Sequence, residues 1–279
     1  MAADMPAETM QGTLYVVATP IGNLDDLSTR AVNVLKSVQI VAAEDTRRTA
    51  VLLAHIEHRA PELLSLHEHN EQQQATRLIE RLQQGADVAL VSDAGTPLVN
   101  DPGYTLVGAA AAANVKTVPV PGPSCITAAL SVCPLPCQPF GYVGYPAARK
   151  SARVKQWQSW LGQGQAVVFL EAPHRIRDTL ADLAQLTDRR IMLGRELTKK
   201  FEEILVGTAD ELSHLVREPR GEFVGIVETG TMSDATQVDE QQVLRALLAE
   251  LSPAQAARIA ASICGKRKSE MYALAMALS

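Results

Sequence analysis

The sequence of 279 residues predicts an α/β protein with two α/β domains and a small C-terminal module of three helices. In most of the chain, short apolar runs alternate with stretches whose apolar residues recur at helical spacing. This alternation is typical of a mostly parallel sheet covered by helices. The last part of the chain has helical spacing alone. The expected ranges are 12–123 and 124–231 for the domains and 238–279 for the module.

The first domain is expected to contain five strands, each an apolar run that ends in a polar or glycine-rich segment. They cover residues 13–18, 40–43, 63–66, 88–91 and 115–120. A helix between the first two follows from the spacing of Leu27, Ala31, Val34, Leu35 and Val38, with Asp25 or Asp26 as its candidate N-cap. Further helices are expected after Arg48, around Ala75–Leu82 with Gly85 at the end, and over the alanine-rich run 109–113.

The second domain has a less regular pattern. Strands are expected over residues 167–170, 191–193, 204–206 and 223–227, with a helix face formed by Ile176, Leu180 and Leu183. The small and polar residues 229–238 indicate a linker.

The C-terminal module is expected to contain three short helices. Leu244, Leu247, Leu248 and Leu251 share one helix face, and Ser252 with Pro253 begins the next helix, whose face is Ala256, Ile259, Ala260 and Ile263. Gly265–Lys268 forms a basic turn before a third helix through Met271 and Leu278. This arrangement fits either a helix-turn-helix-like nucleic-acid module or a helical cap with solvated basic side chains.

Composition restricts the class of protein. The chain is 47% hydrophobic with a net charge of −5, so a nucleic-acid site has to be a local basic patch. The four cysteines match no common zinc spacing, which indicates free thiols. The N-terminus has no apolar targeting core and no stretch is long enough to span a bilayer, so we expect a cytoplasmic protein without membrane contact.

The loop that follows the apolar run 88–91 is the strongest local signal. Its sequence, VSDAGTPLVNDPG over 91–103, combines Gly95 and Pro97 with carboxylates and hydroxyls but no basic residue. Since the carboxyl ends of parallel strands meet at one sheet edge, where open α/β sheets bind ligands, the five strand-end segments should converge there.

Several other activities are disfavoured by missing motifs. The chain has no GxGxxG after its first strand, no P-loop and no GxSxG elbow. His67, Glu68 and His69, together with Glu44 and Asp45, suggest a metal-dependent hydrolase as one alternative, although their spacing matches no strong zinc signature. We expect no metal.

Seven segments together carry a resemblance to a known family. They are ATPIGNLDDLSTRA (18–31), AAEDTRRT (42–49), LHEHNE (66–71), VSDAGTPLVNDPG (91–103), PVPGPS (119–124), EAPHR (171–175) and RELTKKFEE (195–203). In this order they resemble the ribosomal RNA small subunit methyltransferase I family, 2'-O-ribose cytidine methylases of the tetrapyrrole-methylase-like superfamily.

This resemblance implies two α/β domains that bind S-adenosyl-L-methionine in the cleft between them, in a homodimer. The methyl acceptor would be a cytidine 2'-hydroxyl in the decoding region of 16S ribosomal RNA, either as free RNA or within the 30S subunit. A carboxylate-rich loop suits the positive sulfur of the donor. The expected donor contacts are Pro20, Gly22, Asp93, Ala94, Gly95, Thr96, Pro97, Ser124, Glu171, Arg195, Glu196 and Thr198.

The acceptor hydroxyl has to lose a proton, so a general base is expected. The candidates are Glu44, Asp45, His67, His69, Glu171 and Glu196, and we favour Glu44 and Asp45 because Arg47 can orient them. The alternative is that Asp45 caps the next helix. RNA contacts are expected from basic residues, chiefly Arg47, Arg48, Arg149, Lys150, Arg175, Lys266, Arg267 and Lys268.

Two further functions remain open at this point. A related tetrapyrrole C-methyltransferase, acting on a precorrin or uroporphyrinogen, would share the donor site but use a macrocyclic acceptor. A non-catalytic RNA-binding sensor would bind the donor without turnover.

Overall fold

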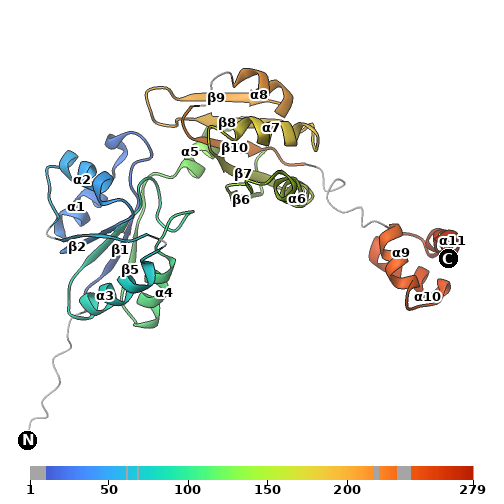
Figure 1. Ribbon diagram of the computed structural model, residues 1–279, viewed down its shortest axis with the longest axis horizontal. Coiled ribbons are helices and arrows are strands. Elements are labelled where there is room, and N and C mark those ends of the chain that lie inside the picture. Colours follow the sequence, from blue (N-terminus) through green and yellow to red (C-terminus); the bar gives the residue numbers. More distant parts are fainter. Residues whose placement is uncertain (1–10, 61, 68, 217–219, 231–239, 279) are drawn as a thin grey trace, which may run out of the picture.

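The computed structural model describes residues 11–60, 62–67, 69–216, 220–230 and 240–278. The first domain contains a five-stranded parallel sheet in the order β3-β2-β4-β1-β5 (Figure 1). Its strands are β1 (Leu14–Val17), β2 (Ile40–Ala43), β3 (Glu62–Ser65), β4 (Val88–Val91) and β5 (Thr117–Val120). The five predicted strands are confirmed.

Helices cover both faces of this sheet, which explains the continuous apolar runs of its strands. On one face, α1 (Thr29–Ser37) and α2 (Thr46–His55) pack on alternate strand residues such as Val41 and Val91. On the other face, α3 (Glu71–Gln83) and α4 (Tyr104–Ala112) pack on Ile40 and Leu90.

The start of α1 differs from the prediction. A short 3₁₀ helix, η1 (Leu24–Asp26), takes up Asp25 and Asp26, and the α1 N-cap is Ser28, whose Oγ accepts a hydrogen bond from the Ala31 amide. The expected N-cap at Asp25 or Asp26 is therefore wrong by one short turn. Gly85 follows α3 with a φ of 93°, as expected of a residue that ends a helix.

The second domain is built on a mixed five-stranded sheet in the order β6-β7-β10-β8-β9. These strands are β6 (Phe140–Gly144), β7 (Ala166–Glu171), β8 (Ile191–Arg195), β9 (Glu203–Gly207) and β10 (Phe223–Val227). The β6–β7 pair is parallel, and the other three pairs are antiparallel. Strand β6 escaped prediction because its sequence, FGYVG, has two glycines and no apolar run.

Helices also lie on both faces of the second sheet. One face is covered by α6 (Lys150–Leu161), α7 (Ile176–Ala184) and α8 (Ala209–Leu215), with Trp157 and Phe169 at its centre. The opposite face packs on α5 (Cys125–Ser131). Gly225 lies opposite Phe169 in the β7–β10 register, and a Cβ at position 225 would lie 2.1 Å from the Phe169 ring.

Contacts between the two domains come from the loop after β1 and from the loop after β4. Ile21 packs into the apolar cluster beneath α5. The Cα of Gly22 lies so close to Lys199 that a Cβ there would approach Lys199 Cγ to 2.3 Å. The two sheets are thus joined through loops at the carboxyl edge of the first.

The C-terminal helices α9 (Glu240–Leu248), α10 (Pro253–Cys264) and α11 (Lys268–Leu278) share an apolar core of their own. Ser252 begins α10 in a capping box with Gln255, as the sequence predicts. Ala256, Ala257 and Ala260 form the buried face, whereas Ile263 is 53% exposed, so its predicted place on that face is wrong. Helix α10 therefore packs its alanine side chains against α9 and α11.

The predicted linker 229–238 lies mostly outside the described residues. Thr229 and Gly230 still belong to the second domain, because their amides donate hydrogen bonds to the carbonyls of Pro136 and Gly164. Among the described residues, no helix is long and apolar enough to cross a membrane.

Candidate active site

The loop after β4 is tied to the other strand-end loops of the first domain. Thr19 and Gly95 exchange two backbone hydrogen bonds of 2.8 and 2.9 Å, with Gly95 at a φ of 82°. The Thr96 hydroxyl donates to the Pro123 carbonyl at 3.2 Å. Three loops that are far apart in sequence therefore form one rigid surface at the sheet edge.

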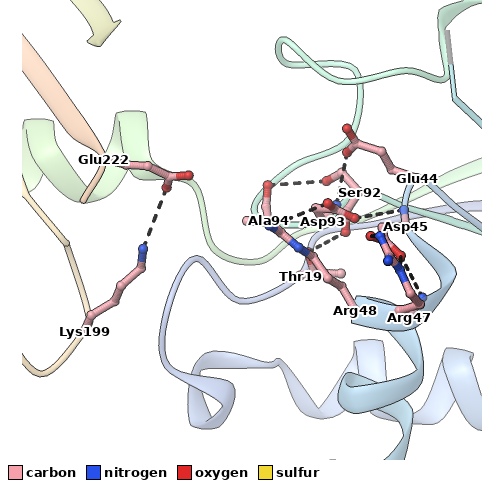
Figure 2. Close-up of polar contacts among 10 residues, drawn as sticks. All are labelled: Thr19, Glu44, Asp45, Arg47, Arg48, Ser92, Asp93, Ala94, Lys199 and Glu222. Carbon is pink, nitrogen blue, oxygen red and sulfur yellow. Dashed lines mark hydrogen bonds and ion pairs between the residues drawn. The ribbon is translucent and has the colours of Figure 1, made fainter. Parts of the chain in front are cut away.

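Acidic side chains gather on this surface. The Asp93 carboxylate accepts a 2.9 Å hydrogen bond from the Asp45 amide, and the Asp93 amide in turn donates to Glu44 Oε2 at 3.3 Å. Arg48 forms an ion pair with Asp93 at 3.3 Å. Figure 2 shows these groups around the ends of β2 and β4. The site is suited to a positively charged ligand group.

Asp45 is committed to holding the start of α2. Its carboxylate caps the Arg47 amide and binds the Arg47 guanidinium through Nε at 3.0 Å and Nη2 at 2.7 Å. The hydrogen bond from the Arg47 side chain is the main reason that the pKa of Asp45 falls to about 2. A carboxylate with such a low pKa is a poor proton acceptor, so the helix-cap alternative describes Asp45 well.

Asp101 has the opposite electrostatic environment. Burial raises its pKa to about 6, and the negative charges of Glu44 and Asp93 act in the same direction, while a hydrogen bond with Ser92 acts against them. The loop around it is fixed, because Glu71 Oε1 accepts from the amides of Gly103 and Thr105 at 3.0 and 2.7 Å. Asp101 is absent from the site residues expected from the sequence.

A cavity of about 380 Å³ lies where the two domains meet. Residues of both domains line it, including Ile21, Gly122, Ser124, Thr127 and Thr198. Ser124 stands at the N-cap position of α5 but makes no capping hydrogen bond with its side chain. The buried Oγ1 of Thr198 has no hydrogen-bond partner among the residues that the structure describes. Both residues line this cavity.

The remaining expected donor contacts of the first domain lie on the same surface. Pro20 and Asp93 line a smaller pocket with Thr19 and Ser92. Ala94 is exposed, whereas Pro97 is buried. Gly22 lies directly against Thr198 and Lys199 of the second domain.

The loop between β8 and β9 forms the second-domain side of the cavity. Glu196 braces it, since its carboxylate accepts from Lys199 Nζ at 2.9 Å and from the Glu222 amide at 3.1 Å. Figure 2 shows Lys199 beside Glu222, to which it is also paired at 3.8 Å. Arg195 forms an ion pair with Glu203 at 3.1 Å. Of the three expected contacts here, Thr198 alone lines the cavity, while Arg195 and Glu196 support it.

Glu171 and Arg175 interact with each other at the end of β7. Glu171 is the last residue of β7, and its side chain shares the face of Phe169, where it accepts from the Thr179 hydroxyl at 2.6 Å. Arg175 pairs with Glu171 at 3.3 Å and donates to the Pro146 carbonyl. Both side chains are thus engaged within the second domain, Glu171 fully buried and Arg175 partly exposed.

The other basic candidates differ in their surroundings. Arg47 and Arg48 are exposed beside the carboxylates, and Arg149 and Lys150 are exposed at the start of α6. Lys266 pairs with Glu240 at 3.3 Å, while Arg267 and Lys268 are exposed at the start of α11.

The histidine alternative has weak geometric support. The rings of His67 and His69 contact edge to face at a centroid distance of 5.9 Å, and Glu68 lies outside the described residues. Within the described part of the chain, no three His, Cys, Asp or Glu side chains are grouped so that they could hold a metal ion.

Sequence comparisons assign the class of protein. Residues 13–213 match the family described as Tetrapyrrole (Corrin/Porphyrin) Methylases, which agrees with the two α/β domains and the cavity at their junction. Residues 234–279 match the RsmI C-terminal HTH domain.

Curated relatives narrow this class. The ribosomal RNA small subunit methyltransferase I of Xylella fastidiosa (strain Temecula1) is 46% identical, covering 94% of this chain and 98% of the relative. The protein of the same name from Pseudomonas aeruginosa is 44% identical, covering 95% and 97%. The chain belongs to the ribosomal RNA small subunit methyltransferase I family.

Solved structures share the fold at lower identity. A diphthine synthase superposes with a TM-score of 0.62 at 18% identity, covering 78% of this chain and 90% of that one. A uroporphyrin-III C-methyl transferase from Thermus thermophilus, complexed with S-adenyl homocysteine, superposes with a TM-score of 0.56 at 17% identity. The match covers 81% of this chain and 100% of that one.

Proposed function

We propose that this protein transfers a methyl group from S-adenosyl-L-methionine to the ribose 2'-hydroxyl of a cytidine in the decoding region of 16S ribosomal RNA. The observation that carries the proposal is the near full-length similarity to ribosomal RNA small subunit methyltransferase I proteins, at 46% and 44% identity. The cavity between the domains and the acidic surface beside it support a methyl-transfer site.

The residues at this junction fit the donor. Its chemistry is an electrophilic methyl group on a positively charged sulfur. Asp93, Glu44 and Asp101 provide negative charge at the sheet edge, which suits a cation. In our proposal the hydroxyl groups of Ser124 and Thr198, which line the cavity, are hydrogen-bonding groups for the donor. In our proposal Pro20, Gly22 and residues 94–97 shape the first-domain wall.

The acceptor hydroxyl needs a proton acceptor. We propose a carboxylate of the Glu44–Asp101 pair for this step, in which the 2'-OH proton passes to a carboxylate oxygen. Asp101 is a stronger base than an ordinary aspartate, because burial raises its pKa to about 6. Asp45 then acts as a positioning residue, since its amide holds Asp93 and its side chain holds Arg47.

RNA binding is assigned to basic groups at two places. Arg47, Arg48, Arg149 and Lys150 lie on the two domains, and residues 266–268 lie on the C-terminal helices. We also propose domain limits at 12–123, 124–231 and 238–279, a homodimer, and work in the cytoplasm on ribosomal RNA or the 30S subunit.

The proposal is tested with labelled S-adenosyl-L-methionine and small ribosomal subunits from cells that lack this gene. After digestion of the RNA, label on the ribose of a cytidine is the expected result. Free 16S RNA in a parallel reaction identifies the form of the substrate. Donor binding without labelled RNA would contradict the proposal and favour a tetrapyrrole acceptor or a sensor.

A matched pair of variants links the reaction to the site. Asp101→Asn should abolish labelling while donor binding persists, and Asp87→Asn, at the opposite end of β4, should leave labelling unchanged. Asp87 is a suitable control because its carboxylate accepts from the Thr13 amide at 2.7 Å, away from the acidic surface.

A further inference from the structure

The loop between β8 and β9 carries a large apolar side chain in solvent. Phe201 is 69% exposed, the greatest exposure of any phenylalanine in the described chain. The ammonium of Lys200 lies 5.7 Å from the centre of its ring. An exposed aromatic ring next to a cation is unusual on a surface that serves only solubility.

The backbone of this loop has an unusual conformation that hydrogen bonds hold in place. Glu196 and Thr198 have φ values of 49° and 67°, which are strained for residues other than glycine and most of all for β-branched threonine. Hydrogen bonds fix this conformation, with the Thr198 amide donating to Glu202 Oε2 at 2.6 Å and the Glu202 amide donating to the Lys199 carbonyl at 3.1 Å. Strain of this kind is concentrated at functional sites.

The ring also lies on the loop that borders the cavity. Thr198 lines the cavity and Lys199 packs against Gly22 of the first domain, only three and two residues before Phe201. A group bound to Phe201 therefore lies close to the mouth of the methyl-transfer site.

Lys200 provides an exposed positive charge beside the ring, and Glu203 is ion-paired with Arg195. RNA offers both groups that such a pair recognises, because unpaired bases stack on exposed aromatic rings and phosphates attract lysines.

We propose that Phe201 is a stacking platform for an unpaired base next to the methylated nucleotide, with Lys200 contacting the RNA backbone. This inference rests on the proposed function. The stack would hold the RNA strand open at the cavity mouth, so that the ribose of the neighbouring nucleotide faces the acidic surface.

The first test compares Phe201→Ala, Phe201→Trp and the wild-type protein in methylation of small subunits. Loss of one base–aromatic stack should raise KM for the subunit about 5- to 150-fold in Phe201→Ala, while Phe201→Trp keeps it near the wild-type value. The Kd for S-adenosyl-L-methionine should not change in either variant. An unchanged KM in Phe201→Ala overturns the stacking role.

The second test uses the new tryptophan as a reporter. Trp157 is buried and Trp160 packs against it, so an indole at position 201 adds a separately exposed fluorophore. Its emission should be quenched on addition of small subunits. Leu215→Trp is the control, because Leu215 is also exposed, at 54%, but lies on α8, away from the cavity.

Two further outcomes would each overturn the stacking platform. If Phe201→Ala changes the sedimentation of the protein from dimer to monomer, the ring is a subunit contact and the RNA assignment is wrong. If wild-type protein does not label ribosomal RNA in the same assay, the proposed function fails and the platform fails with it. A labelled wild type with an unaltered Phe201→Ala KM contradicts the stacking platform alone.

Discussion

The phenol of Tyr142 donates a 2.6 Å hydrogen bond to Oδ1 of Asn100, and this bond joins β6 of the second domain to the loop after β4 of the first. Asn100 has a φ of 65°, and Gly144 lies so close that a Cβ there would be 2.8 Å from Asn100 Nδ2. The neighbour of Asn100 in sequence is Asp101, so the second domain helps to position the proposed base.

Removal of this hydroxyl should therefore weaken both stability and turnover. Tyr142→Phe should lower the free energy of unfolding by about 1 kcal/mol and reduce methyl transfer more than donor binding. Urea denaturation and single-turnover labelling measure the two effects. Tyr104→Phe is the control, because Tyr104 is 81% exposed. Equal turnover in the two variants would show that the hydrogen bond between Tyr142 and Asn100 does not affect catalysis.

The ionisation of Asp101 should make stability depend on pH. Burial raises its pKa from 3.8 to about 6, so the folded protein holds this proton more tightly than the unfolded chain does. The resulting stabilisation is complete below pH 3.8 and is lost as the pH rises through 6. Above pH 6 the ionised Asp101 therefore destabilises the fold.

Asp101→Asn should remove this effect. At pH 7.5 the variant should melt about 2–4 °C above the wild type, and the difference should shrink towards pH 4. Thermal denaturation at several pH values measures it. A variant that melts below the wild type at pH 7.5 would show that the carboxylate stabilises the loop instead.

The buried ion pair of Arg153 and Asp182 should be important for folding. Arg153 Nε lies 2.7 Å from Asp182 Oδ2, with side chains only 4% and 2% exposed, and Arg153 Nη1 donates to the Ala148 carbonyl at 3.0 Å. Arg153→Ala leaves Asp182 buried, with Lys150 at 3.6 Å as its other basic neighbour. We expect a loss of about 3–5 kcal/mol in urea denaturation.

The double variant Arg153→Leu with Asp182→Leu separates charge burial from packing. It should recover part of this loss, since neither charge is then left alone in the interior. If the double variant is no more stable than Arg153→Ala, the lost hydrogen bonds from Arg153 to the loop after β6 account for most of the destabilisation.

The basic turn of the C-terminal helices should contribute to RNA affinity through phosphate contacts. Neutralising Lys266, Arg267 and Lys268 to glutamine should weaken binding and reduce its salt slope by about 2, because Lys266 is partly compensated by Glu240. Donor affinity should stay the same. Filter binding at several salt concentrations measures the slope, with Lys36→Gln plus Lys116→Gln as control. An unchanged slope would favour the helical-cap alternative.

The sequence predicts the centre of the first sheet well because β2 and β4 are fully buried runs of apolar residues. The edge strands β3 and β5 are partly exposed, and the polar segments after the five strands meet at one edge. Strand β6 lacks such a run, since Phe140 is exposed and two of its five residues are glycine. Its place next to β7 depends on tertiary contacts that spacing does not encode.

Site residues are less predictable because strand alternation decides which side chains reach the cavity. Glu171 follows Val167 and Phe169 on the helix-covered face, so this polar residue at the end of a strand is buried against α7. Asp101 could not be predicted for a different reason. Its raised pKa comes from burial and from Glu44 and Asp93, which only the folded chain brings near it.

The missing side chain of Gly22 sets how closely the two domains meet. One added methyl group would press against Lys199 Cγ at 2.3 Å and against the Leu197 carbonyl at 3.1 Å. Lys199 is anchored by Glu196, so the displacement would pass into the strained backbone that presents Thr198 and Phe201. The absence of a side chain at position 22 thus lets the two domains approach each other, and it sets the width of the cavity between them.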